Sequence, residues 1–282
     1  MKNVLVVGAG SALGMQVVLD LRRQAIDVTA TFRREHGGVA DRIAAMGATP
    51  VQIALENRKG FEPLLAAADA SIFLPLLNRS ATMIEMLPPD HLVVFMSSNN
   101  VLACTTDASY DVLRMVETRV RNKMPGAVIL RPTMIYGYDG DHNVSQLVDW
   151  LRRWPVMLHP KAEAKRQPVY YKDLSQVVVN TALNGEFAGR EITVAGPDIV
   201  SQRALIHAVA RTIGRQRLLV PVPLGPAKFL IKALKRLGFR PPVSSEQIER
   251  AHFDKTARGD DIIVTDTRLA DALHQLVSEI DG

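Results

Sequence analysis

Cysteine is nearly absent from this chain of 282 residues, which holds only Cys104. A single cysteine excludes an intrachain disulfide and any zinc site built from several thiolates. No motif of a cysteine nucleophile surrounds Cys104, so we interpret it as a small buried side chain. The seven histidines include no His-x3-His pair. The sequence therefore predicts neither a disulfide framework nor a metal centre.

Long hydrophobic runs are missing as well. No apolar stretch approaches the roughly 20 residues that a membrane-spanning helix requires. The segment Met1–Gly8 carries one lysine and a short apolar run that stops at a glycine. A signal peptide has a longer apolar region followed by a small-residue cleavage site. We therefore expect a cytoplasmic protein without stable membrane insertion.

The excess of charge is small, with a formal net charge of +5. Such a balance suits anionic small ligands such as nucleotides and argues against a nucleic-acid partner. Part of the excess lies in Lys228–Leu237, whose spacing predicts a basic amphipathic helix. This helix fits a membrane surface. We favour the alternative, an apolar face packed on the protein with lysines that reach solvent.

The first 135 residues alternate short runs rich in valine and isoleucine with helical patterns. Runs that are apolar on both faces are typical of parallel strands buried under two helical layers. The expected strands are Asn3–Gly8, Asp27–Phe32, Thr49–Ile53, Ala70–Leu74, Leu92–Ser97 and Ala127–Leu130. The expected helices are Ala12–Gln24, Val39–Met46, Phe61–Ala67, Ser80–Met86 and Ala108–Asn122. This order predicts a Rossmann-type, doubly wound α/β fold with a parallel sheet.

Beyond Tyr136 the pattern loosens, and proline-bearing segments separate the helical stretches. The expected helices are Asn143–Arg153, Asp173–Leu183, Ser201–Ile213, Ala227–Leu237, Ser244–Ala251 and Asp266–Ile280. We therefore expect a sheet domain over residues 1–136 and a small, irregular C-terminal subdomain over residues 137–282. Some segments of the second part are expected to return to the sheet.

A glycine-rich turn, in the stretch VLVVGAGSALG, joins the first expected strand to the first helix. Such a turn lets a pyrophosphate approach a helix N-terminus, where unpaired N–H groups and the helix dipole favour anions. A bare glycine pattern is weak, but this one follows a strand and opens a helix. The alternative is a plain strand-to-helix turn. We predict a dinucleotide site made by Gly8, Gly10, Ser11, Ala12, Leu13 and Gly14.

The residues after the second expected strand bear on the choice of cofactor. Folds that bind NAD usually place Asp or Glu there, where the carboxylate bonds the ribose 2′-hydroxyl. This chain has Arg33 and Arg34, and its first carboxylate is Glu35. Two guanidinium groups suit a 2′-phosphate, which a carboxylate would repel. We favour NADP over NAD, the alternative being an exposed basic turn.

Taken together, these motifs resemble those of extended and atypical short-chain dehydrogenases/reductases, the NAD(P)-dependent epimerase/dehydratase-like proteins, over nearly the whole chain. VVFMSSNNV is similar to the strand that ends in the family's active-site serine, here Ser98, and SYDVLRMVE holds the catalytic tyrosine at Tyr110. VILRPTMIYG, with Pro132 and Tyr136, is similar to the strand and loop beside the nicotinamide. RQPVYYKDL, with Arg166, is similar to the segment that leads into the next helix.

Three departures from the family pattern stand out. Arg114 replaces the lysine four residues after the tyrosine, Ala54 replaces an aspartate near the adenine, and Ser11 stands where a glycine often sits. Tyr110 follows Ser98 by only 12 residues. This spacing is similar to the atypical subgroup that includes NmrA-type regulators and an accessory subunit of respiratory complex I, proteins that often hold a nucleotide without demonstrated turnover.

The resemblance implies a catalytic set of Ser98, Tyr110 and Arg114. Tyr110 would transfer a proton, Ser98 would hold the substrate oxygen, and Arg114 would supply a positive field but cannot give up a proton. The alternatives are a serine that bonds local backbone and a partly buried tyrosine with its hydroxyl in water. Pro132 is expected beside the cofactor.

The same resemblance places Tyr136 and Arg166 on the substrate side. Tyr136 is expected to line a cleft, the alternative being loop packing. The arginine that matches Arg166 in the epimerases grips the diphosphate of a sugar nucleotide, and the alternative here is a surface arginine beside Lys165.

Two functions follow from these motifs. The first is an NADP-dependent oxidoreductase or epimerase-like enzyme that acts on a small molecule, a sugar nucleotide or another carbonyl compound. The second is a sensor or assembly module that binds NADP(H) and catalyses nothing, which Arg114 and the short spacing favour. A scaffold that binds no nucleotide leaves the glycines unexplained. Dimerisation through Ser98–Asn122 stays open.

Overall fold

The computed structural model describes residues 3–102, 108–141, 143–160, 164–214, 218–222, 236 and 254–281. Cys104 and the expected helix Ser244–Ala251 lie outside the described residues, as does Lys228–Leu237 except for Arg236. Unit 1, one of two compact units, comprises residues 1–132, 171–194 and 258–263. Unit 2 comprises residues 133–170, 195–257 and 264–282.

The main sheet has eight strands in the order β14-β11-β6-β5-β4-β1-β2-β3. All six pairings from β11 to β3 are parallel. The strands are β1 (Asn3–Val7), β2 (Asp27–Phe32), β3 (Thr49–Gln52), β4 (Ala70–Leu76), β5 (Leu92–Met96), β6 (Val128–Pro132), β11 (Glu191–Ala195) and β14 (Ile262–Val264). The expected Rossmann-type fold is confirmed.

The strand order reverses on either side of β1. Val7 is in register with Thr31 of β2 on one side and with Phe73 of β4 on the other. The strands are therefore added outward from β1 on both sides. The loop after β1 leads toward β2, and the loop after the neighbouring strand β4 leads the opposite way, toward β5. In open α/β sheets a ligand binds outside the carboxyl ends of the strands at such a switch point.

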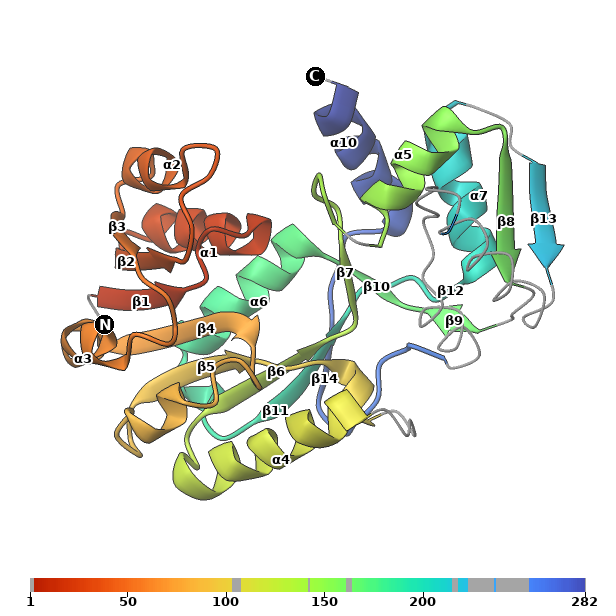
Figure 1. The fold of residues 1–282 in the computed structure, drawn as a ribbon. Helices are drawn as coiled ribbons and strands as arrows, with labels where there is room; N and C mark the ends of the chain where they lie inside the picture. The colour runs from red at the N-terminus through yellow and green to blue at the C-terminus, as the bar shows by residue number, and fades with distance from the viewer. Residues whose placement is uncertain are drawn as a thin grey trace. The chain divides into compact units, whose positions relative to one another are not determined.

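Helices cover both faces of the unit 1 sheet (Figure 1). On one face α1 (Ala12–Arg23) packs against α6 (Tyr171–Leu183), and Ser175 Oγ donates to Asp20 Oδ2 at 2.7 Å. On the other face lie α3 (Arg58–Ala66) and α4 (Ala108–Lys123). Phe61 and Leu113 from these helices join the strand residues Phe73 and Phe95 in one buried core. This layering holds the carboxyl ends of the strands in place.

One expected helix of the first half is wrong. The segment Ser80–Met86 forms only a 3-10 turn, η1 (Met83–Glu85), although Met83 and Ile84 are buried as a helical stripe would be. Two prolines follow at Pro88 and Pro89, and the residue before a proline is disfavoured in helical geometry. The run is therefore too short to continue as an α-helix. Between β2 and β3, α2 (Val39–Ala45) forms as expected.

Unit 2 contains three helices among its described residues: α5 (Ser145–Arg153), α7 (Gln202–Thr212) and α10 (Leu269–Asp281). Three two-stranded sheets accompany them. Their strands are β7 (Met134–Tyr136) with β10 (Pro168–Tyr170), β8 (Val156–Pro160) with β13 (Leu218–Val222), and β9 (Lys165–Arg166) with β12 (Val200–Ser201). These strands were not expected.

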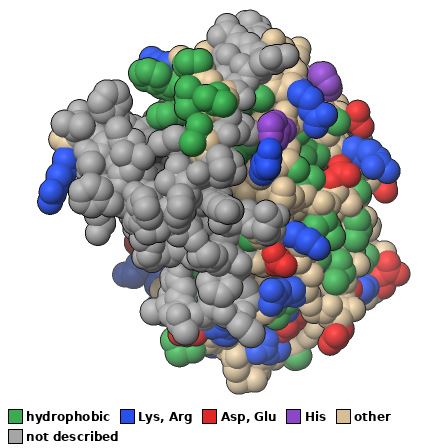
Figure 2. Space-filling model, turned by 90° about the vertical axis from the view of Figure 1, so that its right-hand side faces the viewer, with side chains coloured by type: hydrophobic (Ala, Val, Ile, Leu, Met, Phe, Trp, Pro, Cys, Tyr) green, Lys and Arg blue, Asp and Glu red, His purple; other side chains and the backbone are tan. Residues whose placement is uncertain are grey.

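Buried polar contacts hold unit 2 together. Asp141, which is fully buried, accepts hydrogen bonds from the N–H groups of Val144 and Ser145 and so caps the start of α5. Tyr170 Oη donates to Gln275 Oε1 at 2.7 Å and ties β10 to α10. On the described part of the face in Figure 2, lysine and arginine side chains are interspersed with aspartate and glutamate.

Candidate functional site

The turn after β1 has the geometry of a nucleotide loop. Gly8 has φ +90°, a left-handed conformation that favours glycine. Ser11 is the N-cap of α1, because its Oγ accepts a hydrogen bond from Gly14 N–H at 3.0 Å. That oxygen also donates to the carbonyl of Gly8 at 3.1 Å. The next helical N–H groups, those of Ala12 and Leu13, have no intrahelical acceptor by their position.

Gly14 brings the first helix close to the turn. A Cβ atom at this position would lie 2.5 Å from the carbonyl oxygen of Gly8 and 2.7 Å from Ala9 Cα. Both neighbours are backbone atoms, so only glycine permits this approach. At Gly10 a Cβ would meet Phe32 Cβ at 3.3 Å, which is tight but less severe. The glycine pattern therefore has a steric cause in unit 1.

A pocket of about 660 Å³ opens at the switch point of the sheet. The volume lies within the range typical of small-molecule and cofactor sites. Its lining comes from the glycine turn, the end of β2 and the end of β4: Gly8, Gly10, Ser11, Phe32, Arg33, Arg34, Glu35, His36, Leu74, Pro75 and Arg79. Of the predicted cofactor residues, Gly8, Gly10, Ser11, Arg33 and Arg34 line this pocket, and Ala12, Leu13, Gly14 and Pro132 are not among its lining residues.

Three guanidinium groups give this pocket a positive character. Arg33, Arg34 and Arg79 are exposed, and none of them forms an ion pair with another described residue. The carboxylate in the lining, Glu35, accepts a hydrogen bond from Ala40 N–H at 3.1 Å in the first turn of α2. A carboxylate is favoured at that helix end. Glu35 is therefore held by the helix and leaves the arginines available to an anion.

Ser98 and Tyr110 are linked through one residue that was not expected. Ser98 follows β5, and its Oγ accepts a hydrogen bond from Asn100 N–H at 3.3 Å. Asn100 lies in the 3-10 turn η2 (Asn99–Leu102), and its Nδ2 donates to Tyr110 Oη at 2.9 Å. The ring of Tyr110, near the start of α4, packs against the unit 1 core. The structure thus brings the two predicted hydroxyls to a common residue.

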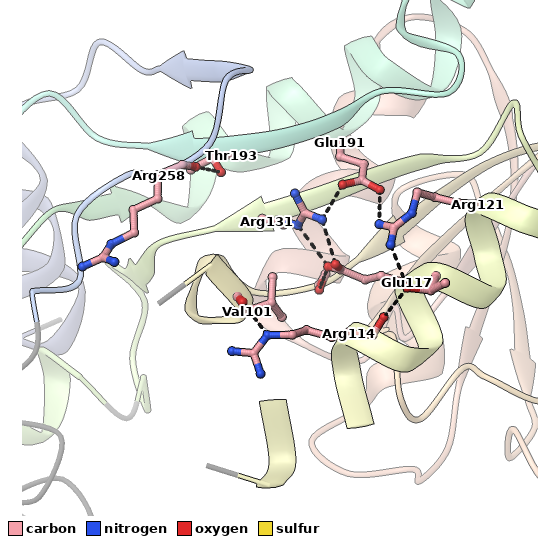
Figure 3. A network of polar contacts seen from close by, with 10 residues as sticks. Val101, Arg114, Glu117, Arg121, Arg131, Glu191, Thr193 and Arg258 are labelled. Carbon is pink, nitrogen blue, oxygen red and sulfur yellow. Dashed lines mark hydrogen bonds and ion pairs between the residues drawn. The ribbon is translucent and has the colours of Figure 1, made fainter. Parts of the chain in front are cut away.

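Arg114 fastens α4 to the same turn. Its Nε donates to the carbonyl oxygen of Val101 at 2.8 Å, and its Nη1 pairs with Asp111 one helical turn earlier. Figure 3 shows the side chain reaching from α4 to Val101. The positive electrostatic field of Arg114 on Tyr110 stays a prediction. The contacts with Val101 and Asp111 also give Arg114 a structural role, because they hold α4 to η2.

A buried ion network joins α4 to β6 and β11 (Figure 3). Glu117 of α4 is 2% exposed and accepts hydrogen bonds from Ser97 Oγ at 2.5 Å and from Arg131 Nη2 at 2.7 Å. Arg131 also pairs with Glu191 of β11, which binds Arg121 in turn. Burial lowers the pKa of Arg131, but Glu117 and Glu191 outweigh it and raise that pKa overall. The network ties α4 to β6, to the first residue of β11 and to the residue that follows β5.

The predicted substrate residues belong to unit 2. Tyr136 is 1% exposed, and its ring lies 6.0 Å from that of Tyr170. Arg166 is 6% exposed, so the alternative of a surface arginine is wrong. Burial lowers the pKa of Arg166, opposed by the charge of Asp254. A buried arginine usually holds an anion or a carbonyl, and here Nη1 donates to the carbonyl of Lys165 at 3.2 Å.

The fold is shared with solved structures of an epimerase and a dehydratase. A nucleoside-diphosphate-sugar epimerase from Pseudomonas aeruginosa has a TM-score of 0.72 at 15% identity, over 99% of this chain and 97% of that one. A dTDP-glucose 4,6-dehydratase from Bacillus anthracis, solved in complex with NAD, has a TM-score of 0.70 at 11% identity, over 100% and 97%. The resemblance stated from the sequence is confirmed at the level of the fold.

Sequence comparison adds a partial relative. No family model matches the chain. Subunit 9 of the NADH dehydrogenase (ubiquinone) 1 alpha subcomplex from Rattus norvegicus, a mitochondrial protein, is 27% identical over 158 residues. The match covers 53% of this chain and 38% of that relative. The chain therefore spans less than half of the relative's length, and its cytoplasmic location stays a prediction.

The described residues contain neither a candidate membrane span nor a candidate metal centre. None of the helices in this part of the chain is both long and apolar enough to cross a membrane. Within the same residues, histidine, cysteine and carboxylate side chains form no group of three that could hold a metal ion.

Proposed function

We propose that the chain binds NADP(H) in the pocket at the switch point and transfers hydride between it and a carbonyl or hydroxyl group of a small molecule. The observation that carries this proposal is the 660 Å³ pocket, in which a glycine turn faces three arginines without a described carboxylate partner. The diphosphate fits the N–H groups of Ala12 and Leu13 at the start of α1. Pro132, which ends β6, is proposed beside the nicotinamide.

The arginines favour the phosphorylated cofactor. A 2′-phosphate carries negative charge and presents several acceptor oxygens, which guanidinium groups bind in a bidentate way. NAD has a neutral hydroxyl at the same place, for which a carboxylate is the usual partner. Glu35 accepts a hydrogen bond from the backbone N–H of Ala40 in α2 and is held there. Three cations with no described carboxylate directed at them therefore support NADP over NAD.

The hydroxyls of Ser98 and Tyr110 supply the remaining chemistry. The bound cofactor would supply the hydride acceptor as NADP+ or the hydride donor as NADPH. Tyr110 moves the proton to or from the substrate oxygen, and Ser98 donates a hydrogen bond to that oxygen. Arg114 contributes positive charge while it remains bonded to Val101 and Asp111. Sugar nucleotides are the substrates of the two structural neighbours, which supports a small carbonyl compound of that kind. The role of Arg166 as an anion partner stays a prediction from the sequence.

A second function is favoured by Arg114. Its guanidinium cannot pass on a proton, and two of its groups are engaged by the protein itself. A module that binds NADP(H) without turnover, as a sensor or an assembly protein, would need no proton path. The partial relative is a subunit of a larger dehydrogenase, which supports the same alternative.

Binding of the cofactor tests the proposal first. Titration of NADPH and NADH followed by nucleotide fluorescence should show tighter binding of NADPH. We expect Arg33→Ala and Arg79→Gln each to weaken NADPH by about tenfold, since one charged hydrogen bond is worth about 1.5–3 kcal/mol, and to leave NADH nearly unchanged. Arg58→Gln is the control for net charge, because Arg58 is exposed and does not line the pocket. Equal affinity for both nucleotides would refute the cofactor assignment.

Turnover separates the enzyme from the sensor. A panel of carbonyl compounds, including nucleotide-linked 4-keto sugars, is screened for oxidation of NADPH. We expect Tyr110→Phe to lower kcat by at least about 100-fold, as for a positioned acid–base group, with NADPH affinity unchanged. NADPH binding without turnover of any compound would favour the sensor. Turnover that is unchanged in Tyr110→Phe would favour another mechanism.

A further inference from the structure

Asn100 is the residue that contacts both hydroxyls of the candidate site. Its backbone N–H donates to Ser98 Oγ, and its side-chain Nδ2 donates to Tyr110 Oη at 2.9 Å. It is half-buried in η2, directly after the strand end that carries Ser98. No motif assigned a role to this position.

An amide donor acts differently on the two forms of a phenol. Hydrogen bonds to an ionised oxygen are roughly twice as strong as bonds to a neutral one. A donor fixed on a phenol oxygen in general favours the phenolate, which is the form that accepts a proton from a substrate hydroxyl. In the neutral form the same bond occupies an acceptor site and leaves the phenolic proton for another oxygen.

The contacts of Arg114 explain why such a donor matters in this chain. Its Nε is held by the carbonyl of Val101, the residue next to Asn100. The turn η2 therefore binds the cation through a carbonyl and presents a neutral amide to Tyr110. The same four-residue turn therefore contacts both Tyr110 and Arg114.

We propose that Asn100 is the positioning residue of Tyr110, and that its side-chain amide holds the phenolic oxygen in the orientation that proton transfer requires. Its backbone N–H holds Ser98 at the same time. Asn100 acts through these two side chains and is not itself a catalytic residue. The role deepens the oxidoreductase function proposed above and rests on it.

Substitution of Asn100 can isolate the contact with Tyr110. Asn100→Ala and Asn100→Asp both keep the backbone N–H that bonds Ser98, so they remove only the side-chain donor. The aspartate is nearly the same size as asparagine and keeps Tyr110 equally shielded, while its charge opposes the phenolate. Asn122→Asp, at the far end of α4, adds the same charge on an exposed residue.

Nitration by tetranitromethane at one fixed pH reports the phenolate fraction without cofactor or substrate. The peptide that contains Tyr110 is followed by mass spectrometry, and the other four tyrosines are internal controls. We expect nitration of Tyr110 to slow about tenfold in Asn100→Ala and further in Asn100→Asp. Asn122→Asp should nitrate as the wild type does.

Kinetics give a second readout. With the carbonyl substrate found above, kcat should fall about tenfold in Asn100→Ala while the KM for NADPH stays the same. Unchanged or faster nitration of Tyr110 in both Asn100 variants would overturn the inference, whether or not the enzyme turns over. If nitration of Tyr110 is slower in the Asn100 variants but the wild-type protein shows no turnover, the contact is upheld and the oxidoreductase function is removed instead.

Discussion

The buried network around Glu117 makes a strong prediction about stability. Glu117 accepts three hydrogen bonds, from Ser97 Oγ at 2.5 Å, Arg131 Nε at 3.0 Å and Arg131 Nη2 at 2.7 Å. Glu117→Gln keeps the shape but removes the charge, and one oxygen becomes an NH₂ group. That group would face a donor of Arg131 or Ser97, so at least one charged hydrogen bond is lost.

The magnitude follows from burial. A hydrogen bond to a charged group is worth about 1.5–3 kcal/mol, and removal of one partner from a buried pair costs about 3–5 kcal/mol. Arg131 keeps its pair with Glu191, whose side chain is 24% exposed, so its charge is not left alone. We therefore expect Glu117→Gln to lower the free energy of unfolding of unit 1 by about 2–3 kcal/mol.

The assay must report unit 1. Both tryptophans, Trp150 and Trp154, lie in unit 2, so tryptophan fluorescence follows the wrong part of the chain. Amide hydrogen exchange in β6 and the middle of α4 reports the network directly. Glu85→Gln is the matched control, because Glu85 also bridges two cations, Arg119 and Lys123, but on the surface.

Two outcomes would refute this reasoning. The first is a loss of protection in Glu117→Gln no larger than in Glu85→Gln. The second comes from the pair Glu117→Leu with Arg131→Met, which replaces both charges by apolar groups and should cost less than Arg131→Met with Glu117 retained. If the double variant lost more unfolding free energy than Arg131→Met alone, the penalty for an unpaired buried charge would not govern the stability of this network.

Two further predictions concern the glycine turn and the acid stability of β11. Gly14→Ala should abolish NADPH binding and cost about 1–3 kcal/mol of unfolding free energy, because its Cβ would lie 2.5 Å from a backbone oxygen. NADPH titration and urea unfolding measure the two effects. Gly126→Ala is the control in both, because a Cβ there would meet nothing within 4 Å. Burial raises the pKa of Glu191, but Arg121 and Arg131 outweigh it and lower that pKa overall. Its stabilising contribution is therefore present above the ordinary pKa of 4.5 and lost as the pH falls through the lower folded value, so Glu191→Gln should flatten the pH dependence of unfolding below about pH 4.5.

The first half of the fold could be predicted because its signals are local. A strand such as Asp27–Phe32 is buried on both faces and bounded by helical patterns, so its residues alone identify it. The strands of unit 2 have between two and five residues. Their partners lie far along the chain, as Val200 pairs with Arg166. Runs this short carry no periodicity, and only tertiary pairing makes them strands.

The site divides in the same way. The glycine turn and Arg33 could be found because each lies within a few residues of a strand end. Arg79 lies at the same pocket after β4 and was missed, since nothing in the sequence indicates that the loop after β4 faces the loop after β2. Asn100 was missed because its partner is ten residues away across a turn. The pairing of Arg114 with Asp111 at a helical spacing of three was readable from the sequence.

Ser11 shows why a departure from a motif need not weaken a site. A glycine at this position would leave the N–H of Gly14 without its acceptor, whereas Ser11 Oγ bonds it at 3.0 Å. Ser11 has φ −86°, so its backbone does not require glycine. The steric demands fall on Gly8, through its positive φ, and on Gly14, through its close approach. The cap fixes the first turn of α1 and leaves the N–H groups of Ala12 and Leu13 for a diphosphate, so the serine prepares the site that the usual glycine would only permit.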